Sequence, residues 1–119
     1  MKIENAIIDS ATLRFEYDNR FLCLSLWLKT QHRMYKFGGV NLGSRHQKEF
    51  NRNAGDYAFW WIKRIFDIVN VESFDDLKGK AVRIEIDDND YINAIGHIIV
   101  DDWFCPKKDF GEEENESKN

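Results

Sequence analysis

The hydrophobic periodicity of this chain changes twice, and that change limits the folds that the chain can adopt. Residues 11–17 alternate apolar and polar side chains with a period of two, which is typical of a strand with one buried face. Residues 56–70 repeat their apolar side chains with the period of a helix, and residues 81–100 return to alternation. An antiparallel sheet packed on a helix satisfies this order, so the sequence predicts an α+β fold.

We expect a sheet of about five strands, one main helix and a short second helix. The strand over 21–28 carries apolar side chains on both faces, which predicts a central position in the sheet. Ser73 and Asp76 have the spacing of a capping box, and Gly79 follows the last expected helical residue. The predicted strands cover residues 11–17, 21–28, 33–40, 81–86 and 91–100, and the predicted helices cover residues 56–70 and 73–78.

Two adjacent glycines interrupt the third predicted strand. Gly38 and Gly39 weaken a regular strand, so they indicate a β-bulge or a point at which something approaches the backbone closely. A simple bend is the alternative. Both glycines are therefore candidate close-approach positions.

The length and composition predict one domain. The chain has 119 residues, of which 43% are hydrophobic, and a chain of this size buries a single core, which we place in residues 1–105. Residues 106–119 are polar and acid-rich, which predicts a disordered tail. The longest apolar run covers only residues 57–62, and Met1–Glu4 is not followed by an apolar signal segment. We therefore expect a cytoplasmic protein with no membrane partner.

No arrangement of side chains in the sequence indicates an enzyme. Cys23 and Cys105 stand far apart with no cysteine beside either, and we expect both to be reduced thiols. The three histidines are scattered, and the acidic residues 87–90 lack the glycine and the terminal glutamate of a calcium loop. Nucleophile-elbow, zinc-helix and phosphate-loop motifs do not occur. We expect no catalytic residue, no metal and no cofactor.

A basic segment follows the second predicted strand. Between residues 29 and 52, six Lys and Arg residues stand against one acid, Glu49, which is a net charge of +5 in a chain whose net charge is -4. Cations interleaved with rings suit a phosphate-bearing ligand or a nucleic-acid strand. A solvated loop whose cations offset the acidic tail is the alternative. The candidate contact residues in this segment are Lys29, Arg33, Tyr35, Lys36, Arg45, Lys48 and Arg52.

Four aromatic residues stand within positions 57–61 of the main helix. Because these rings extend over more than one helical turn, they cannot all face one sheet. An exposed ring marks a partner surface, whereas burial beneath the preceding loop is the alternative. Trp60 and Trp61 are the candidate partner contacts on this helix.

Several short segments give the chain a family resemblance. In these segments the sequence resembles a family of small phage and prophage proteins, over most of residues 3–110. The charged loop 45–52 and the acidic tail look like variable parts. The resemblance is carried by Leu26-Trp27-Leu28, by Phe37-Gly38-Gly39 with Leu42, by residues 65–71, by residues 76–80 with Val82-Arg83, and by residues 94–99 with Trp103-Phe104.

The resemblance implies a binding protein. Small phage proteins without catalytic motifs often disarm a host defence, as anti-CRISPR proteins do. We therefore expect a non-enzymatic protein that inhibits a host defence system by occupying a surface of its effector, in the cytoplasm of an infected bacterium.

Two alternatives to this function stay open. One is an accessory protein of phage DNA metabolism, which would bind single-stranded nucleic acid through the basic segment. The other is an oligomeric sponge for a nucleotide signal, which would use Gly38 and Gly39 for close approach and the nearby cations for phosphate. The sequence leaves the oligomeric state open.

Overall fold

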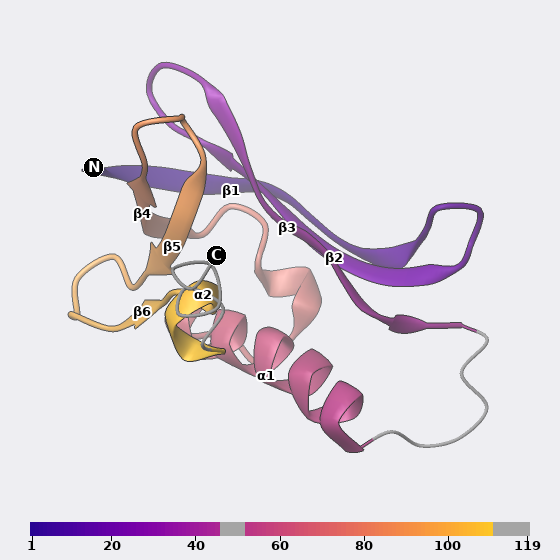
Figure 1. The fold of residues 1–119 in the computed structure, drawn as a ribbon. Coiled ribbons are helices and arrows are strands. Elements are labelled where there is room, and N and C mark those ends of the chain that lie inside the picture. The colour runs from indigo at the N-terminus through magenta and orange to yellow at the C-terminus, as the bar shows by residue number, and fades with distance from the viewer. Residues whose placement is uncertain (46–51, 111–119) are drawn as a thin grey trace, which may run out of the picture.

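The computed structural model describes residues 1–45 and 52–110, and within this part it describes the side chains of all residues except 52–55. A six-stranded antiparallel sheet in the order β3-β2-β1-β4-β5-β6 packs against one main helix (Figure 1). This architecture confirms the predicted α+β class, with one strand more than predicted. The elements are β1 (Lys2–Glu16), β2 (Phe21–Lys29), β3 (Met34–Ser44), α1 (Arg52–Val69), the 3-10 helix η1 (Phe74–Asp76), β4 (Ala81–Ile86), β5 (Ile92–Gly96), β6 (Trp103–Phe104) and α2 (Pro106–Asp109).

Strand β1 connects the two halves of the sheet. Its first half pairs with β4, its second half pairs with β2, and the register shifts between Ile8 and Ser10. At this bulge the backbone N–H of Ile8 donates to Lys80 O (2.9 Å), and the N–H of Gly79 donates to Ile8 O (2.7 Å). The predicted strand over 11–17 is therefore the second half of a longer strand. The first half escaped prediction because exposed Ile3 lies among its polar residues and blurs the alternation.

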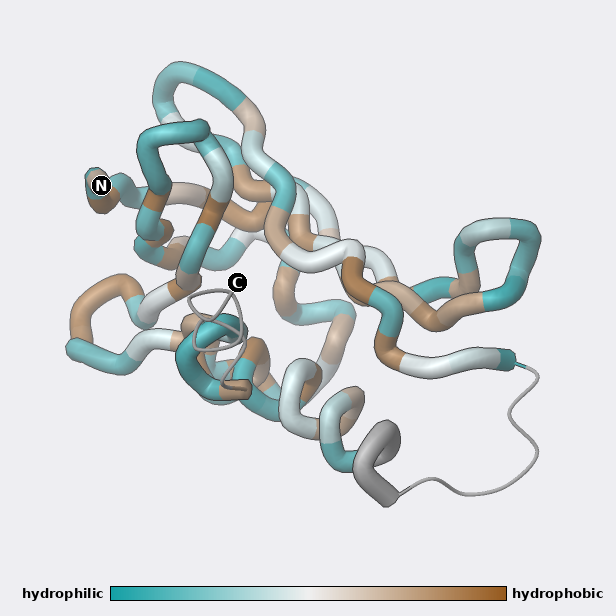
Figure 2. The backbone as a smooth tube through the Cα atoms, in the orientation of Figure 1, coloured by the Kyte–Doolittle hydropathy of each residue, from teal (hydrophilic) through white to brown (hydrophobic). Residues whose placement is uncertain are grey.

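Helix α1 covers one face of the sheet and completes the core. Trp61, Ile65 and Ile68 are each at most 2% exposed and contact the apolar face formed by the strands. The exposed side of α1 carries Asp56, Lys63 and Asp67, as the 3.6-residue pattern predicts, but the aromatic side chains of Phe59 and Trp60 are exposed as well. The hydropathy of the residues along the chain agrees with this arrangement, with hydrophobic residues in the central strands (Figure 2).

The loop expected over residues 41–55 is shorter than predicted. Strand β3 continues to Ser44, and α1 begins at Arg52, four residues before the predicted start at Asp56. The loop-forming Asn41 and Gly43 lie at the end of β3 because Asn41 Oδ1 accepts the Gly43 N–H at 2.9 Å within the strand. Propensity alone ended the strand too early and began the helix too late.

The second predicted helix is a single 3-10 turn. The side chain of Ser73 makes no capping hydrogen bond, so the capping box predicted from Ser73 and Asp76 does not form. Leu77 is completely buried and ends η1, and Gly79 has a φ of +90°. Burial of Leu77 fixes this segment more strongly than its local capping signal.

The predicted strand over 91–100 ends early, at Gly96. Beyond it, the N–H groups of Ile99 and Val100 donate to His97 Nδ1 at 3.0 and 2.9 Å. Arg83 donates from the neighbouring strand to His97 O (2.7 Å) and to Val100 O (2.8 Å). These bonds turn the chain back into β6 and leave hydrophobic residues in the turn (Figure 2). The alternation of apolar residues predicted a longer strand, because alternation does not reveal hydrogen bonds between these side chains and the backbone.

The boundary of the predicted tail also moves. Residues Pro106–Asp109, assigned to the tail, form α2, and Phe110 packs against the core. Proline suits the first position of a helix because the N–H that it lacks has no intrahelical partner there. The rest of the tail, 111–119, lies outside the described residues. Within the described part of the chain, no helix is both long and apolar enough to cross a membrane.

Candidate partner-binding groove

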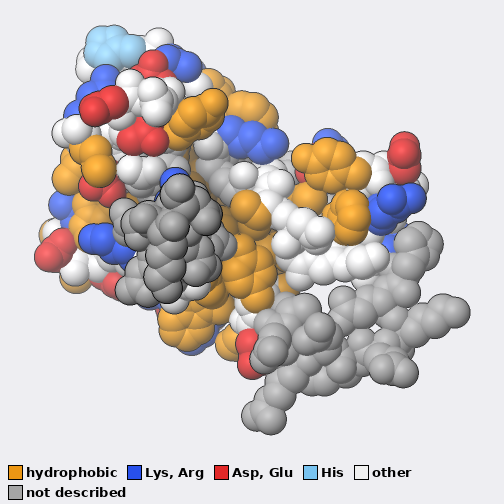
Figure 3. All heavy atoms as spheres, viewed as in Figure 1, with side chains coloured by type: hydrophobic (Ala, Val, Ile, Leu, Met, Phe, Trp, Pro, Cys, Tyr) orange, Lys and Arg blue, Asp and Glu red, His pale blue; other side chains and the backbone are white. Residues whose placement is uncertain are grey.

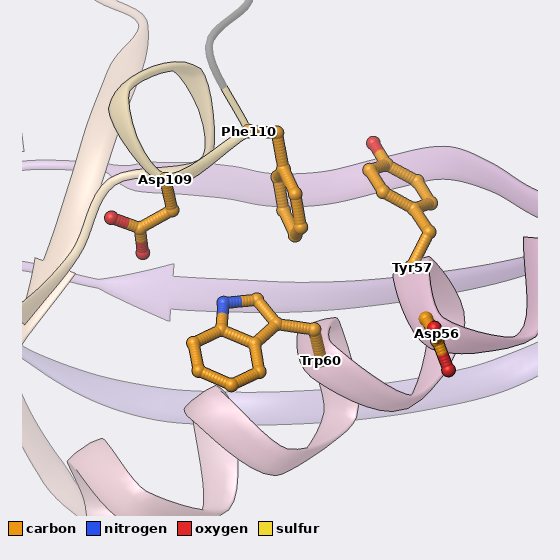
Figure 4. A pocket seen from close by; sticks show the side chains of 5 residues that line it. All are labelled: Asp56, Tyr57, Trp60, Asp109 and Phe110. Atoms are coloured by element: carbon orange, nitrogen blue, oxygen red, sulfur yellow. The ribbon is translucent and has the colours of Figure 1, made fainter. Parts of the chain in front are cut away.

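The first turns of α1 and the short α2 enclose an open groove of about 340 Å³. Asp56, Tyr57 and Trp60 line it from α1, and Asp109 and Phe110 line it from the α2 side (Figure 4). Residues 49 or more positions apart in the sequence therefore form one concave surface. We call the space between these five side chains the α1–α2 groove.

Three rings form the apolar part of the α1–α2 groove. The rings of Tyr57 and Phe110 lie 4.6 Å apart between centroids, at an interplanar angle of 56°. Phe110 also makes an edge contact with the buried ring of Phe104 at 6.3 Å, which anchors α2 to the core. Trp60 lies across the groove from Phe110 and is 39% exposed (Figure 4). Solvent therefore reaches an aromatic surface that the core holds in place.

Two carboxylates flank these rings. Asp109 stands beside Phe110, and Asp56 stands near Tyr57 (Figure 4). Both are exposed, and among the residues that the structure describes neither carboxylate enters an ion pair. The groove therefore combines aromatic faces with negative charge that the described part of the chain does not neutralise.

A second, charged pocket of about 440 Å³ adjoins the groove and shares Trp60 and Asp109 with it. In this pocket Arg64 donates to Asp102 Oδ1 at 2.8 Å and to Trp103 O at 3.1 Å. Lys63 pairs with Asp67 at 2.5 Å and lies 5.4 Å from the ring centroid of Trp60. The two cations are therefore held by neighbouring acids, Arg64 by Asp102 and Lys63 by Asp67.

The structure disperses the cations of the basic segment. Arg33, before β3, pairs with Asp90 at 3.4 Å and stacks 4.8 Å from the ring of Tyr35. Arg45, after β3, lies 3.8 Å from the ring of Phe15 and donates to Asn19 O at 2.9 Å. An eleven-residue strand separates them, which is a span of roughly 30 Å. The two arginines therefore do not share a contact patch, and Arg45 ties the end of β3 to the β1–β2 turn.

Two further predicted cations lie on the face of the sheet opposite α1. Lys29 and Lys36 point away from the buried Leu26 and Leu28 by strand alternation, and Lys36 Nζ lies 5.7 Å from the ring centroid of exposed Trp27. This open face keeps a small basic and aromatic surface. The remaining predicted contacts, Lys48 and the side chain of Arg52, lie outside the described residues.

Two predicted aromatic contacts belong to the core. Tyr35 is 5% exposed and Trp61 is 2% exposed, so neither presents a surface to a partner. The Trp61 ring packs edge-on to Phe104 at 4.9 Å and lies 5.5 Å from Phe37. Its indole Nε1 has no hydrogen-bond acceptor among the described residues, and the surrounding rings offer it only the weak acceptor of a π face. Of the two candidate tryptophans, only Trp60 reaches the surface.

The close approach at Gly38 and Gly39 comes from within the sheet. Gly38 pairs with Ser25, the pairing then skips to Val40 and Leu24, and both glycines have positive φ values of 96° and 80°. This is a β-bulge. A Cβ on Gly38 would lie 2.4 Å from Leu24 O. The close approach predicted at this glycine is therefore made by the backbone of β2 and not by a ligand.

Sequence signals for the residues that complete the groove are weak. Asp56 and Asp109 resemble ordinary surface acids, and Phe110 lies in the segment predicted to be a polar tail. Phe110 is the single aromatic residue of that segment, and it is the local sign that the segment returns to the core. Phe59, 65% exposed one residue before Trp60, was likewise overlooked among the helix aromatics. Hydrophobic side chains gather at the centre of the face seen in Figure 3.

The described side chains give few other reactive groups. Burial, and then the charge of Glu16 and a hydrogen bond with it, raise the pKa of the Cys23 thiol above its ordinary value of 9.0. Within residues 1–45 and 52–110, no three His, Cys, Asp or Glu side chains come together as a set that could hold a metal ion. The expected absence of metal, cofactor and catalysis stays a prediction.

Comparisons with protein-family models, with curated proteins and with solved structures found no match for this chain.

Proposed function

We propose that this protein is a non-enzymatic, phage-encoded inhibitor of a host defence system that acts by occupying a surface of its effector. The phage origin and the defence target come from the sequence resemblance. The proposed contact is the α1–α2 groove together with the neighbouring exposed ring of Phe59. The observation that carries this assignment is the exposure of Phe59 and Trp60, 65% and 39%, beside a groove lined by aromatic rings.

Exposed rings at a concavity are an effective binding surface. An aromatic side chain buries a large area and loses few rotamers when it is immobilised, so aromatic residues dominate the binding energy of protein interfaces. Phe59 and Trp60 lie on a helix, and Phe110 is anchored to the core, so their positions are fixed before a partner arrives. Such preorganisation lowers the entropic cost of binding.

The test is the plating efficiency of a targeted phage on a CRISPR-defended host that expresses the protein. We expect the wild-type chain to restore plating by several orders of magnitude and Trp60→Ala to lose most of that rescue. Tyr91→Ala is the matched control, because Tyr91 is 71% exposed in the β4–β5 turn and does not line the groove. A wild-type chain without rescue would contradict the proposed function, and full rescue by Trp60→Ala would remove the groove from it.

A second candidate function, sequestration of a nucleotide signal, is favoured by the adjoining pocket. Trp60 separates the aromatic groove from the pocket that Lys63 and Arg64 line. A base can stack on an aromatic ring, and cations bind phosphate. Asp56 and Asp109 oppose this candidate, because their charges repel a phosphate in the groove.

Calorimetric titration of the full chain with adenine and guanine mononucleotides separates the two functions. Binding that Lys63→Ala weakens would favour sequestration over occupation of an effector surface. Glu72→Ala, a change at an exposed residue that lines neither pocket, serves as the control. If no heat is detected while the chain still rescues plating, the effector-surface function stands.

A further inference from the structure

We infer that the α1–α2 groove recognises an arginine side chain presented by a protein partner. This inference rests on the proposed function for the identity of the partner and adds the chemistry by which that partner is recognised. Three aromatic rings and two carboxylates that form no ion pair with the described residues, brought together from α1 and the α2 segment, carry it.

The rings are suited to a cation. The face of an aromatic ring carries partial negative charge and attracts a cation placed over it. Trp60 already has one such neighbour from its own chain, because Lys63 Nζ lies 5.4 Å from its ring centroid. Lys63 lines the charged pocket and is not among the side chains that line the groove. The surface that Trp60 turns to the groove stays available to a second cation.

The carboxylates select the sign of the occupant. Asp56 and Asp109 are both exposed, and neither is paired within the described residues. They approach the ring trio from different helices, Asp109 beside Phe110 and Asp56 near Tyr57 (Figure 4). A positive group seated among the rings gains attraction from both acids, whereas a phosphate or a carboxylate is repelled.

Planarity favours arginine over lysine. A guanidinium stacks flat on a ring while its N–H donors, which all lie in the plane, remain directed at acceptors around its edge. An ammonium presents its donors in three dimensions and keeps a tighter hydration shell, so it satisfies rings and two separated carboxylates less well.

The same chemistry occurs elsewhere in this chain. Arg83 lies 4.9 Å from the ring centroid of Trp103 and at the same time donates to His97 O at 2.7 Å and Val100 O at 2.8 Å. One guanidinium therefore serves a ring and two edge acceptors together. The groove offers this combination, an aromatic face with acceptors at the side, to a guanidinium from outside.

The experiment titrates the full chain with blocked arginine, N-acetyl-arginine methylamide, and follows the indole N–H resonance of Trp60 by NMR. Trp60→Phe assigns that resonance among the four tryptophans. The matched probes are N-acetyl-citrulline methylamide, which has the same shape without the charge, and N-acetyl-lysine methylamide. We expect a saturable shift with arginine at millimolar concentration, a weaker one with lysine and none with citrulline.

Two variants and a control locate the interaction. Asp56→Asn with Asp109→Asn should weaken binding of blocked arginine by about 5-fold or more, because both charges are lost while the shape is kept. Glu72→Gln removes an exposed acid that does not line the groove and should change nothing. Unchanged circular dichroism and melting temperature show that each variant is folded. Equal shifts with arginine and citrulline, or no shift up to ~100 mM arginine, would overturn the inference.

These results are separable from those of the plating assay. If blocked arginine binds but the protein gives no rescue, the proposed function fails while the recognition chemistry stands. If the protein rescues plating and blocked arginine does not bind, the inference fails and the proposed function stands. If the double variant Asp56→Asn with Asp109→Asn loses the rescue of plating, the inhibition depends on the carboxylates that are inferred to recognise arginine.

Discussion

The two cysteines differ in their surroundings. Cys23 is 1% exposed, its Sγ donates to Phe21 O at 3.7 Å, and its pKa is raised by burial and then by Glu16. Cys105 is half-buried and lines a pocket together with Lys107 and Lys108. Both thiols are free, as the absence of a neighbouring cysteine predicted.

We predict that only Cys105 reacts readily with a thiol reagent in the native protein. At pH 8 the raised pKa leaves less thiolate at Cys23, and burial keeps the reagent away from it. Counting thiols with Ellman's reagent should give about one fast equivalent and a second only as the chain unfolds. The Cys105→Ser variant should remove the fast phase. Persistence of that phase in the variant would show that Cys23 is accessible.

Gly38 provides a second prediction for a single residue. Gly38→Ala places a methyl group 2.4 Å from Leu24 O at a φ of +96°, so a strained backbone and a clash act together. We expect a loss of about 3 kcal/mol in the free energy of unfolding. Gly79→Ala is the matched control, because its φ is +90° but nothing lies within 4 Å of the added Cβ. Gly79→Ala should lower the free energy of unfolding, measured with urea, by about 1 kcal/mol. Equal losses in the two variants would show that the bulge at Gly38 relaxes to accept the methyl group.

At the scale of elements, α2 depends on one aromatic anchor. Phe110 contacts Tyr57 and Phe104, and the four-residue helix before it has no buried residue of its own. An isolated helix of this length does not persist in water. Docking of Phe110 therefore decides whether α2 and the groove wall exist.

We predict that Phe110→Ala destabilises the protein by about 2 kcal/mol, since a half-buried ring loses less than a fully buried one. The variant should also lose binding of blocked arginine, because Asp109 is no longer held beside the rings. Lys108→Ala, on the same helix but exposed, should stay within about 0.5 kcal/mol of the wild type. Urea unfolding measures both. A stable variant that still binds arginine would show that α2 docks without its anchor.

The elements also show where sequence patterns were sufficient. The apolar run in β2, the alternation in β4 and the helical spacing in α1 located these elements, because their buried faces are continuous. The patterns were insufficient over η1 and over residues 97–102. In those segments the burial of Leu77, the bonds from Arg83 to His97 O and Val100 O, and the local bonds to His97 Nδ1 set the backbone. The contacts of Leu77 with the core and of Arg83 with its acceptors join residues that are distant in sequence.

At the scale of the whole molecule, one core connects all six strands and α1. Its buried members include Ala6 and Ile8 from β1, Ile65 from α1, Ile95 from β5 and Phe104 from β6. The two halves of the sheet share β1 and close over the same helix (Figure 1). A continuous core of this kind unfolds as a unit.

We predict a single cooperative unfolding transition in urea. Far-UV circular dichroism reports the sheet and helix, and tryptophan fluorescence reports Trp61 in the core with Trp27, Trp60 and Trp103 nearer the surface. The two transitions should coincide within error. Transitions with separate midpoints would show that the two halves of the sheet are independent, and would contradict the expected single domain.

The sequence by itself determined the fold class, the main helix and most strands of this protein, because burial of one face imposes a period that can be read locally. It also indicated Trp60 as a candidate partner contact, and the structure leaves this side chain exposed. Only the tertiary structure decided which candidate residues share a surface. A strand sends neighbouring side chains to opposite faces and separates its ends, so the basic segment is dispersed and Tyr35 is buried. Docking of Phe110 on Tyr57 places Asp109 and Asp56 along one concave surface, the α1–α2 groove. A contact between two segments that are distant in sequence produces no periodic pattern, so the sequence alone does not predict it.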